Sequence, residues 1–268
     1  MSIRTSPWPQ GVPCWTDLMA PDVGLARSFY EAVLGWSFSD TGDEYGGYVI
    51  AEVKGAAAAG IGPLQEGART AWTLYFAADD ADATAAKVPE LGGTVLLEPG
   101  DVGPLGRMFI ATDPTGAPFG VWQAGSHIGA GIANEPGGFT WEDLHTTGPD
   151  EARTFFAGLF DFRYEEIPDA GDYRIMFRPG EDFPLGGIGP LLGDEGTPHW
   201  IVYFGVADAD AAASAAERAD GSVLSPPYDT PYGRMAGLID PAGASFWVVQ
   251  DTSGNQPDRS GEPTPKRA

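Results

Sequence analysis

Apolar and polar residues follow one succession of patterns twice along this chain. The first succession begins at residues 12–19, an apolar stretch typical of a buried strand. Asp22 comes next, at a position that favours the start of a helix. Three apolar residues then recur at helical spacing: Leu25, Phe29 and Val33. Gly35 predicts the end of this helix, and alternating apolar residues at 36–38 and 48–53 predict strands.

The same order of elements is repeated inside the first half of the chain. Residues 72–76 form another apolar stretch, and Asp79-Asp80 after it predicts the start of a second helix. Gly92 predicts the end of this helix. Three more strands are expected at 94–97, 108–112 and 119–123. Each unit therefore has the order strand, helix, three strands (βαβββ), and two such units make up half of the chain.

Six landmarks show that the second half of the chain is a copy of the first. Arg27 matches Arg153, 126 positions further on, and Trp72 matches Trp200, 128 positions further on. The landmark pairs are Trp15–Leu18 with Trp141–Leu144, Arg27–Tyr30 with Arg153–Phe156, Gly60–Leu64 with Gly187–Leu191, Trp72–Phe76 with Trp200–Phe204, Gly106–Met108 with Gly233–Met235, and Asp113–Gly116 with Asp240–Gly243. Self-similarity of this kind indicates tandem structural units.

These patterns divide the chain into two α+β domains. We expect the first domain at residues 12–124 and the second at 138–250, joined by a glycine-rich linker at 125–137. Residues 1–11 form an N-terminal arm. Residues 251–268 are polar and rich in proline and glycine, so we expect a flexible tail.

The composition is that of a folded and strongly acidic protein. The chain has 268 residues, of which 43% are hydrophobic, and its formal net charge is −23. This charge repels phosphate backbones and anionic lipids, so we expect neither nucleic-acid nor membrane partners. A cytoplasmic location is expected, because the sequence shows no signal-peptide core and no apolar run that would span a bilayer. Cys14 is the one cysteine, and we expect it in the core.

Four βαβββ modules, with Asp-Pro-x-Gly before the last strand of each copy, resemble the vicinal oxygen chelate superfamily. This superfamily includes glyoxalase I, bleomycin-resistance proteins and extradiol dioxygenases. Within it, the chain is similar to a tandem two-domain actinobacterial subgroup, some of whose members belong to antibiotic pathways. The resemblance implies an α+β fold of two tandem glyoxalase-like domains, in which four modules form open-barrel clefts. It also implies small-molecule chemistry at a divalent metal in those clefts.

The residues at the positions of the superfamily's metal ligands are not metal ligands in this sequence. The resemblance places these positions at Trp15 and Trp141 in the first strands, Thr73 and Ile201 in the fifth strands, Gly120 and Trp247 in the last strands, and near Ala59 and Gly187. Metals of this class are bound by imidazole or carboxylate groups. We therefore expect no metal and no other cofactor.

Tryptophan and acidic side chains are expected to line the clefts instead. Side chains two apart in a strand share a face, so Asp17 is expected to point with its neighbours Trp15 and Met19, and Asp143 with Trp141 and His145. The candidate ligand-binding residues are Trp15, Asp17, Met19, Thr73, Trp122, Trp141, Asp143, His145 and Trp247. An aromatic lining suits a flat, hydrophobic ligand, and an amine on the ligand would meet one of the aspartates. The alternative is structural: tryptophans in the core, where we expect Trp36, Trp72 and Trp200, and aspartates bonded to backbone.

Histidine accompanies the aspartate only in the second copy. Asp143 and His145 are candidate catalytic residues, since a metal-free enzyme needs an acid–base pair. Met19 stands at the matching position of the first copy. A structural role of His145 is the alternative. Arg107 and Arg234 are expected to pair with carboxylates in preference to an anionic substrate.

We expect the clefts to form across the two copies. The first half of the first copy would meet the second half of the second copy, which places Trp15 and Asp17 beside Trp247. The other cleft would hold Trp141, Asp143 and His145 with Thr73 and Trp122. The loops around Tyr45–Tyr48, Phe183 and Tyr228–Tyr232 would cover the cleft mouths. The chain would be a monomer with pseudo-twofold symmetry or a homodimer.

The sequence supports two hypotheses about function. The first is metal-independent binding of a hydrophobic, planar aromatic molecule, such as an antibiotic or polyketide-like metabolite, by a sequestering or pathway-accessory protein. The second is a glyoxalase-like or hydroxylase-type enzyme of natural-product metabolism that uses Asp143 and His145 without a metal. A metal-dependent lyase or dioxygenase is disfavoured, because the ligand positions carry no suitable side chains.

Overall fold

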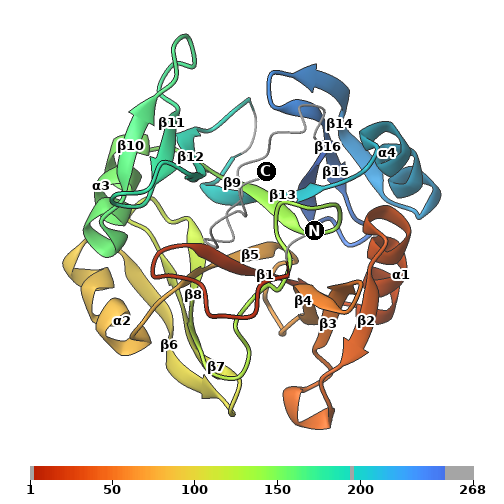
Figure 1. Cartoon of the computed structure of the whole chain (residues 1–268), viewed down its shortest axis with the longest axis horizontal. Coiled ribbons are helices and arrows are strands. Elements are labelled where there is room, and N and C mark those ends of the chain that lie inside the picture. The colour runs from red at the N-terminus through yellow and green to blue at the C-terminus, as the bar shows by residue number, and fades with distance from the viewer. Residues whose placement is uncertain (1–2, 194–195, 251–268) are drawn as a thin grey trace, which may run out of the picture.

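Each half of the chain folds into one eight-stranded sheet with two helices (Figure 1). The computed structural model describes residues 3–193 and 196–250, so the tail expected at 251–268 lies outside the described residues. The first half contains β1 (Pro13–Ala20), α1 (Val23–Leu34), β2 (Ser37–Asp40), the short 3-10 helix η1 (Asp43–Tyr45), β3 (Val49–Val53), β4 (Ala56–Pro63), β5 (Trp72–Ala77), α2 (Ala81–Glu90), β6 (Thr94–Val102), β7 (Gly106–Thr112) and β8 (Pro118–Ala124).

The second half repeats these elements. It contains β9 (Phe139–Thr146), α3 (Pro149–Phe160), β10 (Arg163–Glu166), β11 (Arg174–Phe177), β12 (Pro184–Pro190), β13 (His199–Gly205), α4 (Ala209–Arg218), β14 (Ser222–Thr230), β15 (Gly233–Ile239) and β16 (Ser245–Gln250). The strand orders are β2-β3-β4-β1-β5-β8-β7-β6 and β10-β11-β12-β9-β13-β16-β15-β14. The end strands do not pair with each other among the described elements, so both sheets are open. The expected α+β fold of four βαβββ modules is confirmed.

Helices α1, α2 and α4 begin at aspartate caps, as expected for α1 and α2, whereas α3 begins after Gly148 without a side-chain cap. Asp22 accepts a hydrogen bond from the Leu25 backbone N–H at the start of α1, and Asp80 accepts one from Ala83 at the start of α2. Asp208 does the same for α4. Gly35 ends α1 in the left-handed conformation with φ of 69°, a conformation that glycine adopts at little cost. Local sequence therefore sets these helix boundaries.

The two modules of one copy join through their first strands. Strand β1 runs antiparallel to β5, with Asp17 opposite Thr73, and β9 runs antiparallel to β13, with Asp143 opposite Ile201. The expected clefts across the two copies are therefore wrong. The physical reason is that β1 and β5 occupy each other's free hydrogen-bonding edge, as do β9 and β13, so each eight-stranded sheet is completed within one copy.

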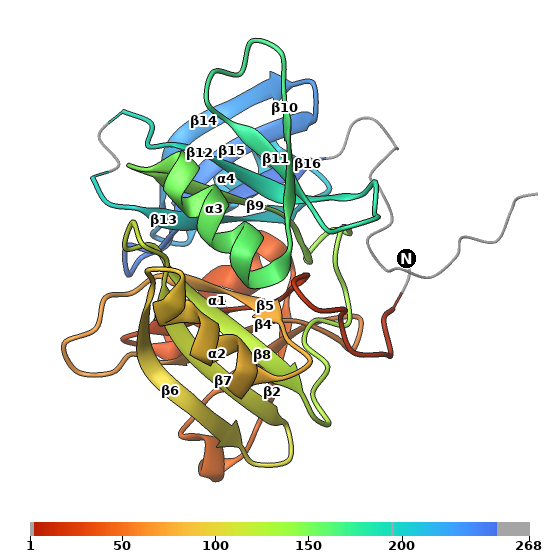
Figure 2. The same ribbon diagram turned by 90° about the vertical axis from the view of Figure 1, so that its left-hand side faces the viewer.

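The copies meet through their helices and the apolar sheet faces behind them. Helix α1 packs against α4, and α3 packs against α2 (Figures 1 and 2). Phe29 of α1 lies 6.1 Å from Phe246 of β16, and Phe156 of α3 lies 5.7 Å from Phe76 of β5, measured between ring centroids. The first half of copy one does meet the second half of copy two, but in a shared core. The core tryptophans Trp36, Trp72 and Trp200 are buried there, as expected.

One buried hydroxyl group distinguishes the two helix-packing sites. The Tyr30 hydroxyl donates to Asp240 Oδ2 and accepts from Trp72 Nε1, both over 3.1 Å. Phe156 stands at the matching position of the second copy. Its neighbour Trp200, 5.5 Å away between ring centroids, has a buried Nε1 with no hydrogen-bond partner among the described residues, and so has Oδ2 of Asp113, which matches Asp240. The second site therefore lacks a hydroxyl that the first site uses.

Phe156→Tyr is expected to raise the free energy of unfolding by about 1 kcal/mol, because the new hydroxyl would meet both unpartnered groups. The matched change Tyr30→Phe is expected to lower it by about 1–2 kcal/mol, since it leaves Trp72 Nε1 without its acceptor. Urea denaturation followed by circular dichroism measures both. A Phe156→Tyr protein less stable than the wild type would contradict the expected symmetry.

No helix in the described part of the chain is long and apolar enough to cross a membrane.

Arg107 pairs with Asp82 and Asp101, and Arg234 pairs with Asp210 and Asp229, so the expected pairing of both arginines with carboxylates is confirmed. Cys14 is fully buried, as expected for a core residue.

Candidate functional site

The candidate residues lie on the faces of the two sheets that point away from the helices. In β1 and β9 the alternate residues Leu18 and Leu144 are fully buried in the core between sheet and helices. The second sheet carries a separate apolar cluster on its other face, formed by Ile201, Tyr203 and Val249 with Trp141, Met235 and Trp247. We call this face, including Asp143 and Tyr228, the second aromatic face. The matching face of the first sheet, around Asp17, is the first aromatic face.

Asp143 lies at the centre of the second aromatic face and accepts three hydrogen bonds. Its Oδ1 accepts from Trp141 Nε1 over 2.7 Å and from the Tyr173 hydroxyl over 2.6 Å. Its Oδ2 accepts from the Tyr203 hydroxyl over 2.9 Å. Burial raises the pKa of Asp143, and these hydrogen bonds together with the charge of His145 offset only part of that rise. The carboxyl group is thus fixed in place by two tyrosines and a tryptophan.

Asp17 has the same place on the first aromatic face but fewer partners. The hydroxyls of Tyr48 and Tyr75 donate to Asp17 Oδ2 over 3.2 and 3.1 Å. The other oxygen, Oδ1, is buried without a hydrogen-bond partner among the described residues. Burial raises the pKa of Asp17 to about 7, with the two tyrosine hydrogen bonds opposing the rise. Asp17 is therefore partly protonated near neutral pH.

His127, from the segment that follows β8, packs onto the first aromatic face. Its ring centroid lies 4.6 Å from that of Trp15 and 5.6 Å from that of Trp122. Trp122 Nε1 donates to the His127 carbonyl oxygen over 2.9 Å. Trp15 and Trp122 are only 4% and 7% exposed as a result. Burial lowers the pKa of His127 to about 4, so the imidazole is neutral. The first aromatic face is largely filled by the protein itself.

Trp247 gives the second aromatic face a ring that the first face lacks. Its ring centroid lies 5.8 Å from Tyr203 and 6.2 Å from Tyr228, which is 43% exposed. Trp247 and Trp141 are half-buried. The first copy has Gly120 at the position of Trp247. Tyr75 lies so close over Gly120 that an added Cβ would come within 2.2 Å of its ring. The difference in side-chain size at this position therefore adds to the effect of His127 in making the two faces different.

The structure separates the predicted site residues into two groups. Trp15, Asp17, Met19, Thr73 and Trp122 lie on the first aromatic face, whereas Trp141, Asp143, His145 and Trp247 lie on the second. The predicted grouping of Trp247 with Asp17, and of Thr73 and Trp122 with Asp143, is wrong, because each sheet is built from one copy.

His145 lies beside Asp143 on the second aromatic face. It is 7% exposed, and its ring centroid is 6.1 Å from that of His199, which is its cross-strand neighbour. The electrostatic attraction between His145 and the Asp143 carboxylate lowers the pKa of Asp143 and so opposes the effect of burial. An imidazole next to a carboxyl group is the arrangement that acid–base chemistry needs.

Four tyrosines were missed in the sequence as partners of the aspartates. Tyr75 and Tyr203 are two residues after Thr73 and Ile201, so strand alternation alone places them on the same face as these positions. Tyr48 and Tyr173 lie over glycines of the neighbouring strand, where an added Cβ at Gly60 or Gly187 would come within 1.7 or 1.8 Å of a tyrosine hydroxyl oxygen. Repeated tyrosines opposite repeated glycines were the available signal.

The residues at the superfamily's metal positions do not fit a divalent metal. Indole, isoleucine and glycine offer no ligand atom there, Thr73 offers only a neutral hydroxyl, and the carboxylates of Asp17 and Asp143 accept hydrogen bonds from tyrosines. Among the described residues no group of three or more His, Cys, Asp or Glu side chains is arranged to hold a metal ion.

Comparison with known proteins establishes the family. Residues 14–121 and 138–256 match the Glyoxalase/Bleomycin resistance protein/Dioxygenase superfamily, and the chain belongs to it. CFP32 of Mycobacterium tuberculosis, provisionally named a glyoxylase, is 40% identical over 257 residues, which cover 92% of this chain and 97% of CFP32. The anthracycline biosynthesis protein DnrV of Streptomyces peucetius is 38% identical over 258 residues, 90% of this chain and 93% of DnrV.

Solved structures share the fold at low sequence identity. The Mn(II)-bound glyoxalase from Novosphingobium aromaticivorans is 18% identical, with a TM-score of 0.64 over 90% of this chain and 83% of that chain. The 2,3-dioxygenase LapB from Pseudomonas sp. KL28 is 16% identical, with a TM-score of 0.63 over 95% of this chain and 96% of that chain. These likenesses concern the fold, so the chemistry has to be argued from the site itself.

Proposed function

We propose that this protein binds a hydrophobic, planar aromatic small molecule on its second aromatic face without a metal ion. The observation that carries the proposal is the half-buried ring of Trp247 beside Tyr203 and Tyr228, around a buried, hydrogen-bonded Asp143. Flat aromatic ligands bind such surfaces by stacking, and a few fixed polar groups orient them.

The lining favours a ligand that carries hydroxyl or carbonyl groups on its ring system. Tyr203 keeps acceptor capacity on its hydroxyl oxygen while it donates to Asp143, whereas the Tyr173 hydroxyl already accepts from Trp141 Nε1 over 3.3 Å, so a phenolic hydroxyl is a suitable partner for Tyr203. Anthracyclines, which appear in the name of the relative DnrV, are polycyclic aromatics with such groups. We infer that this protein sequesters or delivers a metabolite of this kind as an accessory of its pathway.

Quinizarin, a dihydroxylated anthraquinone, is a suitable probe for this proposal. We expect isothermal titration calorimetry to show one bound quinizarin per chain. The affinity is expected to be the same before and after dialysis against EDTA, because no metal takes part. Loss of binding after dialysis, with recovery on adding back a divalent metal, would overturn metal independence. Absence of any binding to the untreated protein would overturn the proposed ligand class.

A second candidate function is catalysis by Asp143 and His145, and the closeness of these two buried side chains is the observation that favours it. The enzyme would be a glyoxalase-like or hydroxylase-type enzyme of natural-product metabolism. Chemical change of the bound ligand that is lost in His145→Gln, with affinity unchanged, would support the enzyme. Binding without chemical change would support the accessory role.

A further inference from the structure

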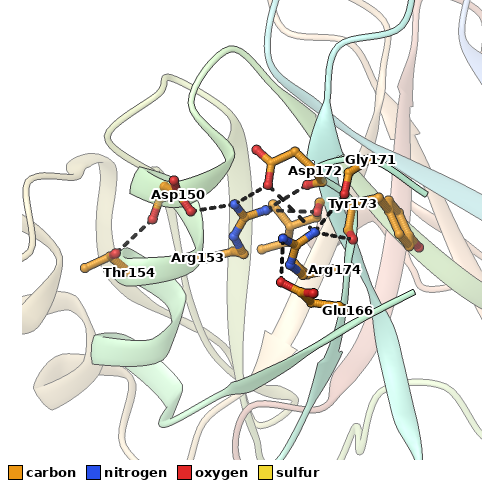
Figure 3. A network of polar contacts seen from close by, with 9 residues as sticks. Asp150, Arg153, Thr154, Glu166, Gly171, Asp172, Tyr173 and Arg174 are labelled. Carbon is orange, nitrogen blue, oxygen red and sulfur yellow. Dashed lines mark hydrogen bonds and ion pairs between the residues drawn. The ribbon is translucent and has the colours of Figure 1, made fainter. Parts of the chain in front are cut away.

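Arg153 occupies a buried position on the helix side of the second sheet, where helix α3 meets strand β12 and the segment that precedes β11 (Figure 3). Its side chain, on helix α3, is only 9% exposed. The guanidinium donates to Asp150 Oδ1 on the same helix over 2.6 Å and to Asp172 Oδ1 over 2.8 Å. It also reaches the backbone carbonyl oxygen of Asp172 over 3.0 Å and that of Ile188 in β12 over 3.5 Å.

These contacts hold the backbone on both sides of Tyr173. Asp172 directly precedes Tyr173, and Ile188 lies between Gly187 and Gly189, the two glycines that the Tyr173 ring covers. Arg174, on the other side of Tyr173, donates to the Tyr173 carbonyl oxygen over 3.0 Å and to Glu166 Oε1 over 2.9 Å (Figure 3). The segment that carries Tyr173 is thus joined to α3, β10 and β12.

We propose that Arg153 is a positioning residue for the second aromatic face: it holds Tyr173 over Gly187 so that the Tyr173 hydroxyl stays on Asp143. The proposal rests on the proposed function, because it assigns a role in the same site. A planar guanidinium can bond two carboxylates and two carbonyl oxygens at once, whereas a lysine ammonium acts from a single point.

The first copy shows that this role belongs to the second face alone. Arg27 stands at the matching helix position, but its side chain is 39% exposed and pairs with Asp40 over 3.2 Å. The tyrosine that matches Tyr173 is Tyr48, which follows Gly47 and whose carbonyl oxygen accepts from Thr41 Oγ1 over 2.6 Å. Arg27 therefore provides a matched control for any general effect of changing this helix position.

The pKa of Asp143, followed by carbon-13 NMR of its carboxyl group without ligand, tests the proposal. Tyr173→Phe is expected to raise this pKa, because the carboxylate loses a hydrogen-bond donor. Arg153→Lys keeps the positive charge and is expected to raise the pKa in the same direction. The double variant is expected to show no further rise, because both changes remove the same hydrogen bond. Arg27→Lys is expected to leave the Asp143 titration unchanged. Tyr203, Tyr228, His145 and Trp141, which also face Asp143, are the same in the wild type and in all four variants.

An unchanged Asp143 titration in Arg153→Lys, or a double variant in which the two shifts add, would overturn the positioning role. If Arg153→Lys fails to fold, Asp172→Ala replaces it, because Asp172 is half-exposed and supplies the carboxylate that Arg153 holds. Asp172→Ala is expected to raise the pKa of Asp143 as well, and no change would count against the proposal. Since no ligand is present, a failure of quinizarin to bind would overturn the proposed function while leaving this result intact.

Discussion

Replacing Trp247 with alanine is expected to weaken quinizarin binding about 30-fold, because truncating a central aromatic anchor costs about 2 kcal/mol of binding free energy. Trp247 is half-buried and packs beside Tyr203 and Tyr228, so its ring offers apolar surface for stacking on the second aromatic face. Isothermal titration calorimetry gives the change in Kd, and circular dichroism checks the fold.

Trp15→Phe is the control for this prediction. Trp15 lies on the first aromatic face against His127 and is 4% exposed, so a ligand bound on the second face does not touch it. We expect a change in Kd within about twofold, as for a residue outside a binding surface. A Trp247→Ala protein that binds as tightly as the wild type would contradict the proposed location. An equal loss of quinizarin affinity in both variants would point to a general effect on the fold.

Asp17 is expected to make the protein less stable as the pH rises, and Asp17→Asn is expected to remove this contribution. The folded-state pKa of about 7 lies above the ordinary value of 3.8. Between these two values the folded state keeps a proton that the unfolded state has lost, so the free energy of unfolding falls with rising pH. At about 1.4 kcal/mol per pKa unit, the loss between pH 3 and pH 8 is on the order of 4 kcal/mol.

Asparagine cannot ionise, so Asp17→Asn is expected to be more stable than the wild type at pH 8 and similar to it at pH 4. Urea denaturation at a series of pH values measures how the free energy of unfolding changes with pH. Asp82→Asn serves as a control of opposite sign, because the hydrogen bond from Arg107 lowers the pKa of exposed Asp82. It is expected to lose a little stability at pH 8. If the free energy of unfolding of Asp17→Asn falls with rising pH as steeply as that of the wild type, Asp17 titrates as an ordinary carboxyl group.

The family itself leaves the chemistry open. Solved structures with the same fold include a manganese-bound glyoxalase and a dioxygenase, whereas the relatives at 38–40% identity include a protein named for anthracycline biosynthesis. The strand positions that carry metal ligands in the fold have tryptophan, threonine, isoleucine or glycine in this chain. Function on a shared fold depends on such site residues, which is why Trp247, Asp143 and Arg153 are the positions to change first.

The sequence by itself determined the duplicated βαβββ order, the capped starts of the helices and the core tryptophans. These features depend on local patterns: strand alternation, helical spacing, and turn or cap residues, all of which act within a few positions. The same alternation placed Trp141, Asp143 and His145 together on one strand face. Repeated tyrosines opposite glycines were also present in the sequence, but their meaning depends on which strands are neighbours.

Only the tertiary structure decided which modules share a sheet and which face is filled. The pairing of β1 with β5 and of β9 with β13 depends on long-range hydrogen bonds, and sequence patterns do not distinguish it from pairing between copies. The packing of His127 on Trp15, and the reach of Arg153 to Asp172 and Ile188, join residues far apart in the chain. Such contacts arise from packing in three dimensions, so two matching strands produced one filled face and one with a half-buried tryptophan.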